Sequence, residues 1–325
     1  MGSRIVSTGR AVPERTLSND DLARTMDTSD EWVRSRTGIV RRHALCHGES
    51  LADLAAAASR IALDRAGIRP GALDAIVAGT VSSEYAFPSF GCQIQERLGL
   101  SGIPAFDVAA ACSGFVYALS VADAFERAGD FKRVLVIGAD ALSTMADWSD
   151  RRTAVLFGDG AGAAVVVSEP GNRGVMQSLM RSAGEHWKLL ALRATGIRGA
   201  FDSEARRSAD DAITMQGPEL FKLAVKSMAE ITRQVAERAG VTLADIDLVV
   251  PHQANLRIIT AVAERLGLPE SKVFTNIAEY GNTSAASVPI ALDEAIEQGR
   301  IRDGNLVMLN ACGGGLTWGA NLIRW

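Results

Sequence analysis

Cys112 is the residue of this sequence best suited to covalent chemistry. It lies within residues 109–115, directly after the strand-like residues 105–108 and before a helical stretch at 116–127. The unpaired N–H groups and the dipole at a helix N-terminus favour the thiolate, the form of cysteine that attacks carbonyl carbon. The segment alone leaves a second interpretation open, because a lone cysteine is most often a small buried thiol.

His252 and Asn282 are the residues that could act with Cys112. His252 directly follows the apolar run 248–250 and Pro251, and Asn282 opens a segment that leads into a helical stretch. Open α/β sheets gather ligands and reactive groups at the carboxyl ends of their strands, so the three side chains could converge there. Papain-like hydrolases also use Cys, His and Asn, but in secreted, disulfide-rich chains with the cysteine near the mature N-terminus. This chain has only four cysteines, widely spaced.

An internal repeat with an offset of 173 residues relates the elements that carry these side chains. It pairs residues 65–68 with 238–241, 73–77 with 246–250, 118–119 with 291–292, and 134–136 with 307–309. Each copy reads as helix, turn, buried strand, helix and buried strand, since short apolar runs alternate with helical stretches. Cys112 corresponds to Ala285, so only one copy keeps a nucleophile at this position.

The repeat predicts an α/β fold made of two halves related by a pseudo-twofold axis. Residues 1–170 would form the half with Cys112, and residues 171–325 the half with His252 and Asn282. Apolar runs without polar alternation predict strands covered by helices on both faces.

Composition narrows the classes of function. The chain has 325 residues, 47% of them hydrophobic, and a net charge of −4, which argues against disorder and against a nucleic-acid partner. No stretch approaches the ~18 apolar residues of a membrane span, and charged residues interrupt the N-terminus, so we expect a cytoplasmic protein without a signal peptide. His43, Cys46 and His47 form the one group of possible metal ligands, but without a second pair elsewhere we expect no metal site.

Two glycine-rich segments, 157–162 and 313–315, invite comparison with dinucleotide-binding loops. In those loops glycines follow a strand and open a helix. Here strand-like residues follow the glycines instead. We therefore expect tight turns, and no nucleotide redox cofactor.

Several stretches together resemble β-ketoacyl-acyl-carrier-protein synthase III, a family of the thiolase superfamily, over essentially the whole chain. They are residues 27–32, 36–39, 109–115, 157–162, 251–257, 281–287 and 313–315. The resemblance implies a thiolase-like, five-layered αβαβα fold and a homodimer. It also implies an acyltransferase that uses coenzyme A thioesters as substrates, with no metal or other cofactor.

The resemblance assigns a reaction to the three residues. Cys112 takes an acyl primer from acyl-CoA, and a carbanion formed by decarboxylation of malonyl-acyl-carrier protein then attacks the thioester, which initiates fatty-acid synthesis. His252 and Asn282 would donate hydrogen bonds to the enolate, through Nε2 and Nδ2. The backbone N–H groups of Cys112 and Gly314 would form the oxyanion hole for acyl transfer.

Binding residues follow from the same resemblance. Trp32 and Arg151 would sandwich the adenine of coenzyme A, a role suited to an aromatic face and a planar guanidinium. Further residues would line the pantetheine channel: Arg36, Thr37, Met215, Gly217, Phe221, Ala254 and Asn255. A third set would bind the acidic carrier protein: Lys222, Gln253, Arg257 and Arg265.

The acyl pocket is where the sequence departs most from the family. Phe87 would cross the dimer interface and form the floor of the partner's pocket, which predicts short primers. Cys312 replaces a phenylalanine common in the family, Arg152 replaces a frequent glycine, and residues 181–211 diverge beside the pocket. Two alternatives therefore remain: an acyltransferase or condensing enzyme of secondary metabolism, and a non-catalytic partner subunit of a polyketide-type heterodimer. The latter would be expected to lack Cys112 or His252.

Overall fold

The computed structural model describes residues 2–192 and 212–325, and two β-sheets dominate it. The first sheet has the order β1 (Gly2–Ala11), β7 (Asp159–Glu169), β6 (Arg133–Ala141), β4 (Ala75–Gly79) and β5 (Ala105–Val108). The second has the order β11 (Leu248–Pro251), β12 (Leu306–Gly313), β13 (Thr317–Arg324) and β8 (Gly174–Ser182). In the first sheet β5, β4 and β6 are parallel, and in the second β11 and β12 are parallel; the remaining neighbours in both sheets are antiparallel.

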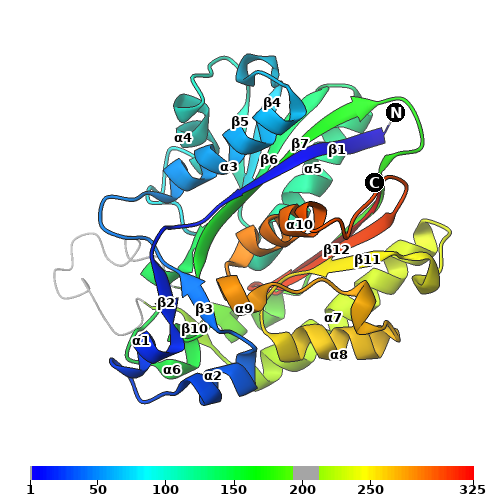
Figure 1. Ribbon diagram of the computed structural model, residues 1–325. Helices are drawn as coiled ribbons and strands as arrows, with labels where there is room; N and C mark the ends of the chain where they lie inside the picture. The colour runs from blue at the N-terminus through cyan, green and yellow to red at the C-terminus, as the bar shows by residue number, and fades with distance from the viewer. Residues whose placement is uncertain (1, 193–211) are drawn as a thin grey trace.

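Helices cover both faces of each sheet (Figure 1). Two helices lie between the sheets, α5 (Gly114–Ala128) and α10 (Ser287–Glu297). The outer face of the first sheet packs on α3 (Leu51–Ala66) and α4 (Phe90–Arg97), and that of the second on α7 (Gly217–Arg238), which in turn contacts α8 (Leu256–Leu266). The predicted five-layered αβαβα fold is confirmed.

Alternation along the strands explains why their sequences are apolar throughout. Val77 and Val136 face the central helices, whereas Ile76 and Leu135 face α3, and all four are fully buried. A strand with helices on both faces has no solvent-facing side, so apolar residues are favoured at every position.

The 173-residue repeat is visible as repeated architecture. Strand β11, helix α10 and strand β12 each begin 173 residues after β4, α5 and β6. The counterpart of β5 is reduced to one isolated bridge between Val249 and Val273. The strands of the first sheet all precede residue 170 and those of the second all follow it, while the division into two domains at this residue stays a prediction.

Short elements border the carboxyl ends of the parallel strands. They are β2 (Thr16–Ser18), α1 (Asn19–Ala23), α2 (Asp30–Thr37), β3 (Arg41–His43), α6 (Arg151–Ala154), β9 (Leu190–Ala191), β10 (Thr214–Met215) and α9 (Ile277–Tyr280). Within residues 2–192 and 212–325, no helix has both the length and the apolar character that crossing a bilayer requires.

Two buried ionisable residues belong to the framework of the fold. Arg42 is fully buried and donates hydrogen bonds to the carbonyl groups of Leu17 and Val155, while burial lowers its pKa to about 10. Glu126 lies buried in α5, where burial and then the neighbouring carboxylate of Asp123 raise its pKa to about 8. Glu126 therefore holds a proton in the folded state at neutral pH.

Candidate active site

Cys112 lies on a strained turn that joins β5 to α5. The turn is a 3-10 segment, Ala111–Ser113, and Ala111 has φ +46°, in the left-handed region that non-glycine residues rarely adopt. The equivalent turn of the second half, Ser284–Ala286, has the same feature, with φ +50° at Ser284. Both halves thus use one backbone device to place a residue at the start of a central helix, and Cys112 occupies it in the first half.

The two turns differ in what their backbone N–H groups meet. The N–H of Ala285 donates to the buried Asp140 carboxylate over 3.0 Å. Cys112 is the counterpart of Ala285, and Gly313 is the counterpart of Asp140. Gly313 lies so close that a Cβ added to it would be 2.6 Å from the Cys112 nitrogen. Within the described residues no oxygen accepts the Cys112 N–H. It is therefore available to a ligand.

The Cys112 thiol is buried and protonated at neutral pH. Its side chain is 5% exposed, and its Sγ lies 3.4 Å from the Ser284 hydroxyl oxygen. Burial first, and then the charge of Asp140, raise the thiol pKa to about 12. The helix N-terminus would stabilise the thiolate, but the cost of desolvating the charged sulfur is larger. The thiol must lose its proton as it reacts.

His252 follows β11 and is held from two sides. Its backbone N–H donates to the carbonyl of Asn310 over 2.8 Å, and its Nδ1 lies 2.5 Å from the Ser287 hydroxyl at the start of α10. Burial lowers the pKa of His252 to about 3, so the ring is neutral at pH 7. Because Nδ1 is engaged, Nε2 is the ring nitrogen left for a substrate.

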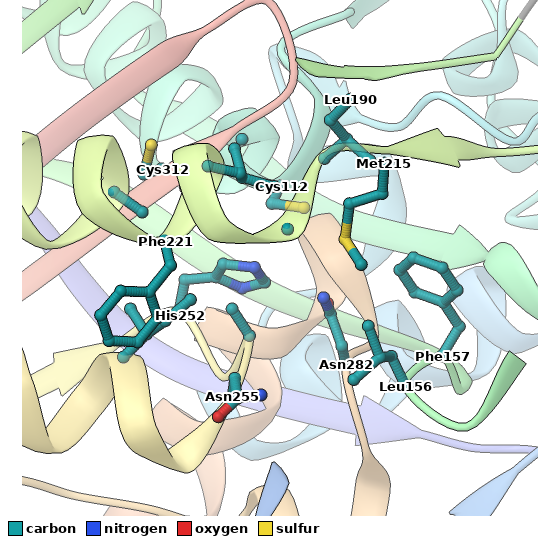
Figure 2. Close-up of a pocket in the computed structure, with 16 residues that line it drawn as sticks. Cys112, Leu156, Phe157, Leu190, Met215, Phe221, His252, Asn255, Asn282 and Cys312 are labelled. Atoms are coloured by element: carbon teal, nitrogen blue, oxygen red, sulfur yellow. The ribbon is translucent and has the colours of Figure 1, made fainter. Parts of the chain in front are cut away.

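Asn282 is fixed through its backbone and its side-chain oxygen. Its N–H donates to the carbonyl of Leu156, and its carbonyl accepts from the N–H of Gly158. These two bonds form a parallel bridge between Asn282 and Phe157. Its Oδ1 accepts the N–H of Ser284 over 2.9 Å. The amide nitrogen is therefore turned into the cavity, as Figure 2 shows.

One cavity of about 140 Å³ brings these three side chains together (Figure 2). Six other residues proposed from the sequence also line it: Met215, Gly217, Phe221, Ala254, Asn255 and Cys312. Sequence reasoning missed the rest of the lining: Leu156, Phe157, Leu190, Leu220, Ala224, Ile258 and Gly313. Most of these are apolar residues next to a matched motif or on a helix that carries one, and an apolar residue type alone does not separate a pocket wall from a core.

Comparisons with known proteins agree with this geometry. Residues 106–184 match the family model 3-oxoacyl-acyl-carrier-protein (ACP) synthase III, and residues 236–325 match its C-terminal model. The chain is 47% identical over 325 residues to a β-ketoacyl-acyl-carrier-protein synthase III of Aquifex aeolicus, with 100% of both chains covered. It is 47% identical over 323 residues to one of Xanthomonas campestris, covering 99% of this chain and 98% of the relative.

The chain belongs to the β-ketoacyl-acyl-carrier-protein synthase III family. A crystal structure of the Aquifex aeolicus 3-oxoacyl-acyl-carrier-protein synthase III matches the whole of both chains with a TM-score of 0.93 and 46% identity. The family resemblance of the sequence is thus confirmed.

At the edge of the site, two guanidinium groups lie against the ring of Trp32. Those of Arg36 and Arg151 lie 4.5 Å and 4.9 Å from its ring centroid. Arg151 also donates to Asp27, and the Arg36 carbonyl accepts from the Asn255 side chain. An adenine could enter between Trp32 and Arg151, as the family resemblance implies, only if the two side chains separated.

Two of the residues assigned from the resemblance are buried and hydrogen-bonded within the protein. Thr37 is 3% exposed, and its hydroxyl donates to Val33 and accepts from Ile39, so it closes the end of α2. Its contact with coenzyme A stays a prediction. Gln253 is 1% exposed, and its amide bonds to Pro251, Phe274 and Asn276. Its amide therefore supports the loop of His252, and its contact with a carrier protein stays a prediction.

The remaining assigned residues lie around the cavity or away from it. Gly314 follows the lining residue Gly313, and a Cβ there would meet the carbonyl of Leu190 at 3.0 Å. Lys222, Arg257 and Arg265 are exposed on α7 and α8. Phe87 is 85% exposed and does not line this chain's cavity.

Of the divergent stretch 181–211, residues 181–192 are described, and Leu190 lines the cavity. Residues 193–211 lie outside the described part of the chain. Arg152 pairs with Asp150 on the surface. In the described ranges, 2–192 and 212–325, no three His, Cys, Asp or Glu side chains gather as metal ligands would.

Proposed function

We propose that this acyltransferase condenses a short acyl-CoA primer with malonyl-acyl-carrier protein, the first condensation of fatty-acid synthesis. The observation that carries the proposal is a single cavity in which a buried thiol, a neutral imidazole and an inward-turned amide meet. Family membership supports the reaction class. The presence of Cys112, His252 and Asn282 together also argues against a non-catalytic partner subunit.

Acyl loading is the first half-reaction. The sulfur of Cys112 attacks the thioester carbonyl of acyl-CoA, and the coenzyme A thiolate leaves, so one thioester replaces another. The carbonyl oxygen becomes an oxyanion on the way. The free N–H of Cys112 and that of Gly314 are the proposed donors to it, and the absence of a side chain at Gly313 keeps the first of them accessible.

Condensation is the second half-reaction. Malonyl-acyl-carrier protein loses carbon dioxide, and the resulting carbanion attacks the acyl-Cys112 thioester, which releases the β-ketoacyl product and the cysteine sulfur. Negative charge develops on the thioester oxygen of the malonyl group during decarboxylation. When Ser287 donates to Nδ1 of the neutral His252, Nε2 carries the ring proton and can donate to that oxygen together with Nδ2 of Asn282. This route calls for no metal or redox cofactor.

Substrate binding is proposed at two places outside the cavity. Trp32 and Arg151 would take the adenine of coenzyme A, with Arg36 beside them and the pantetheine passing Met215 and Phe221. The exposed cations Lys222, Arg257 and Arg265 would meet the acidic carrier protein. We also propose that the protein works in the cytoplasm. Its nucleophile is a free thiol, which a reducing compartment preserves, and its proposed substrates are acyl-CoA and an acyl-carrier protein.

A homodimer is proposed from the first sheet. Strand β5 is an edge strand, and its four residues are only partly buried. Unpaired edge strands readily pair with another chain, and Tyr85 and Phe87 expose 59% and 85% of their surface on a preceding loop. Pairing of two copies at this edge would cover those rings, and Phe87 would then reach the acyl pocket of the partner.

The test is to incubate the protein with acyl-CoAs from acetyl to dodecanoyl and to weigh the intact chain and its Cys112 peptide. We expect one adduct on Cys112 with acetyl and short branched chains, and little with decanoyl or longer ones. Overpacking of a buried pocket costs roughly 1–3 kcal/mol, or about tenfold to a hundredfold in rate. Phe87→Thr should extend the accepted length, with Tyr85→Thr on the same loop as the control. Equal loading of dodecanoyl and acetyl by the wild type would refute the short-primer proposal.

A further inference from the structure

Ser284 places a polar side chain against the reacting sulfur of Cys112. Its hydroxyl oxygen lies 3.4 Å from Sγ of Cys112, and Ser284 is 1% exposed. Its left-handed backbone, with φ +50°, is the feature that the turn shares with Ala111. Ser284 is therefore a buried neighbour of the nucleophile.

Asp140 lies on the other side of Ser284, fully buried at the end of β6. Its Oδ1 accepts hydrogen bonds from the Thr80 hydroxyl, the Val81 N–H and the Ser82 hydroxyl, at 3.1, 2.9 and 2.7 Å. Its Oδ2 accepts the N–H of Ala285, and the Ser284 hydroxyl also contacts the carboxylate. No Lys, Arg or His in residues 2–192 and 212–325 forms an ion pair with it. A fully buried carboxylate without a cation is costly, and packing alone does not call for one.

The hydroxyl between these two groups can donate only one hydrogen bond. A thiol is a weak donor and a carboxylate only accepts, so the arrangement that satisfies all three is a chain. The Ser284 hydroxyl lies within reach of both Sγ of Cys112 and the Asp140 carboxylate. In the chain, the S–H of Cys112 would donate to Oγ of Ser284 while the O–H of Ser284 donates to Asp140. Such a chain is a path along which a proton can move.

We propose that Ser284 and Asp140 form a proton relay for Cys112. The inference rests on the proposed function, because it supplies the missing base for acyl loading. As the S–C bond forms, the S–H bond breaks, its proton passes to Oγ of Ser284, and the Ser284 proton passes to Asp140. The coenzyme A thiolate takes its proton from solvent. When condensation releases the sulfur of Cys112, the proton on Asp140 returns by the same path, so the enzyme ends each cycle as it began.

The internal repeat supports a role tied to the thiol. The counterparts of Ser284 and Asp140 in the other half are Ala111 and Gly313, which carry no polar side chain. Asp140 lies in the half of Cys112 and Ser284 in the other half, and neither has a polar counterpart, so the pair occurs only once, beside Cys112. A purely structural link between strand end and turn would serve both halves equally.

The surroundings of Asp140 suit a group that accepts a proton for part of the cycle. Cys112 and Asp159 are the titratable groups that face it, and neither is a cation. Burial raises the pKa of Asp140 above its usual range, although its hydrogen-bond donors oppose this. His252 is engaged at Nδ1 by Ser287, so the relay leaves its Nε2 for the second half-reaction.

Ser284→Ala is the decisive variant, with Ser82→Ala as its matched control. Alanine is compatible with the backbone, because Ala111 has nearly the same φ in the other half. Ser82→Ala also removes a hydroxyl from Asp140, but one that does not contact Cys112. Two single-turnover rates are measured between pH 6 and 9: acyl loading from acetyl-CoA and alkylation of Cys112 by iodoacetamide.

We expect Ser284→Ala to slow both reactions by roughly a hundredfold at pH 7, the usual scale of a lost general base. Its rates should then rise tenfold per pH unit, since solvent must take the thiol proton, while the wild-type profile stays flatter. Release of carbon dioxide by the pre-acylated variant should stay close to the wild-type rate. Asp140→Asn should share the slow loading and the steeper pH profile.

Three results would overturn the relay: loading and alkylation by Ser284→Ala at wild-type rates, an unchanged pH profile, or equal slowing by Ser82→Ala. Failure of the proposed function would look different. In that case the wild type would take no acyl group from any acyl-CoA, while the alkylation rates would still report on the relay.

Discussion

Replacing Gly313 with alanine tests the geometry on which the oxyanion hole depends. The added Cβ would lie 2.6 Å from the nitrogen, 3.2 Å from the Cα and 3.2 Å from the Cβ of Cys112. These neighbours are backbone atoms and the root of a side chain, so none can rotate away. Optimal contacts are near 3.5–4.0 Å, so Cys112 or β12 must move by roughly 0.5–1 Å.

The shift would obstruct one oxyanion donor and displace the nucleophile together. Loss of one donor costs about 10²–10³ in rate, and a misplacement of about 1 Å can cost about 10². We therefore expect Gly313→Ala to load acetyl-CoA about 10²–10³ times more slowly in a single-turnover mass assay. Its free energy of unfolding should fall by about 1–3 kcal/mol, as for other overpacked cores.

Gly162→Ala is the control for overpacking alone. Its Cβ would lie 2.7 Å from the Cβ of Pro289, at the packing of β7 on α10 and away from the cavity. It should lose similar stability, yet load acetyl groups at nearly the wild-type rate while folded. Wild-type loading by Gly313→Ala, or equally slow loading by both variants, would refute the reasoning.

Further expectations concern the chemistry and the framework. Cys112→Ser should abolish acyl loading, because an alcohol lacks the acidity and leaving ability of a thiol; an adduct on the serine, or on another cysteine of the wild type, would contradict this. His252→Ala and Asn282→Ala should each spare much of loading but cut release of labelled carbon dioxide from malonyl-carrier protein by about 10²–10³. Glu126→Gln should be more stable than the wild type above pH 8, by about 2–4 kcal/mol, and similar at pH 4. The folded-state pKa of Glu126, about 8, exceeds its ordinary value of 4.5, so the wild type loses stability as pH rises through that window; thermal unfolding that shows no such divergence would rule this out.

Much of the fold was predictable because its periodicities are strong and doubled. The apolar runs at Val134 and Val307 lie in strands that begin 173 residues apart, and the central helices begin at Gly114 and Ser287 with the same spacing. The missing counterpart of β5 was not foreseen. Its reduction to a bridge at Val273 depends on the path of a loop, which leaves no apolar repeat in the sequence.

The site was predictable where a motif contains the reacting group and less so where a neighbour sets its properties. Cys112, His252 and Asn282 meet in one cavity, as expected. The neutrality of the imidazole and the protonated thiol follow from burial, which a motif does not report. Ser287 was visible within a matched stretch, but its contact with His252 spans 35 residues and needed the fold.

Thr37 and Gln253 show what a matched motif leaves open. Both stand in matched stretches, yet the hydroxyl of one and the amide of the other are used up inside the protein. A matched stretch can contain residues that shape a site and residues that contact its ligand, and sequence alone does not tell the two apart.

Cys112 lies in one half, whereas Ser284, His252 and Asn282 lie in the other, and this has a consequence for synthesis of the chain. The contact of Cys112 with Ser284 joins residues 172 apart, and that of Ala285 with Asp140 joins residues 145 apart. Chains grow from the N-terminus, and early segments begin to fold first. A nascent first half therefore carries Cys112 and Asp140 without Ser284, His252 or Asn282. By the proposed relay, its thiol should take up acyl groups only slowly until translation has delivered the second half.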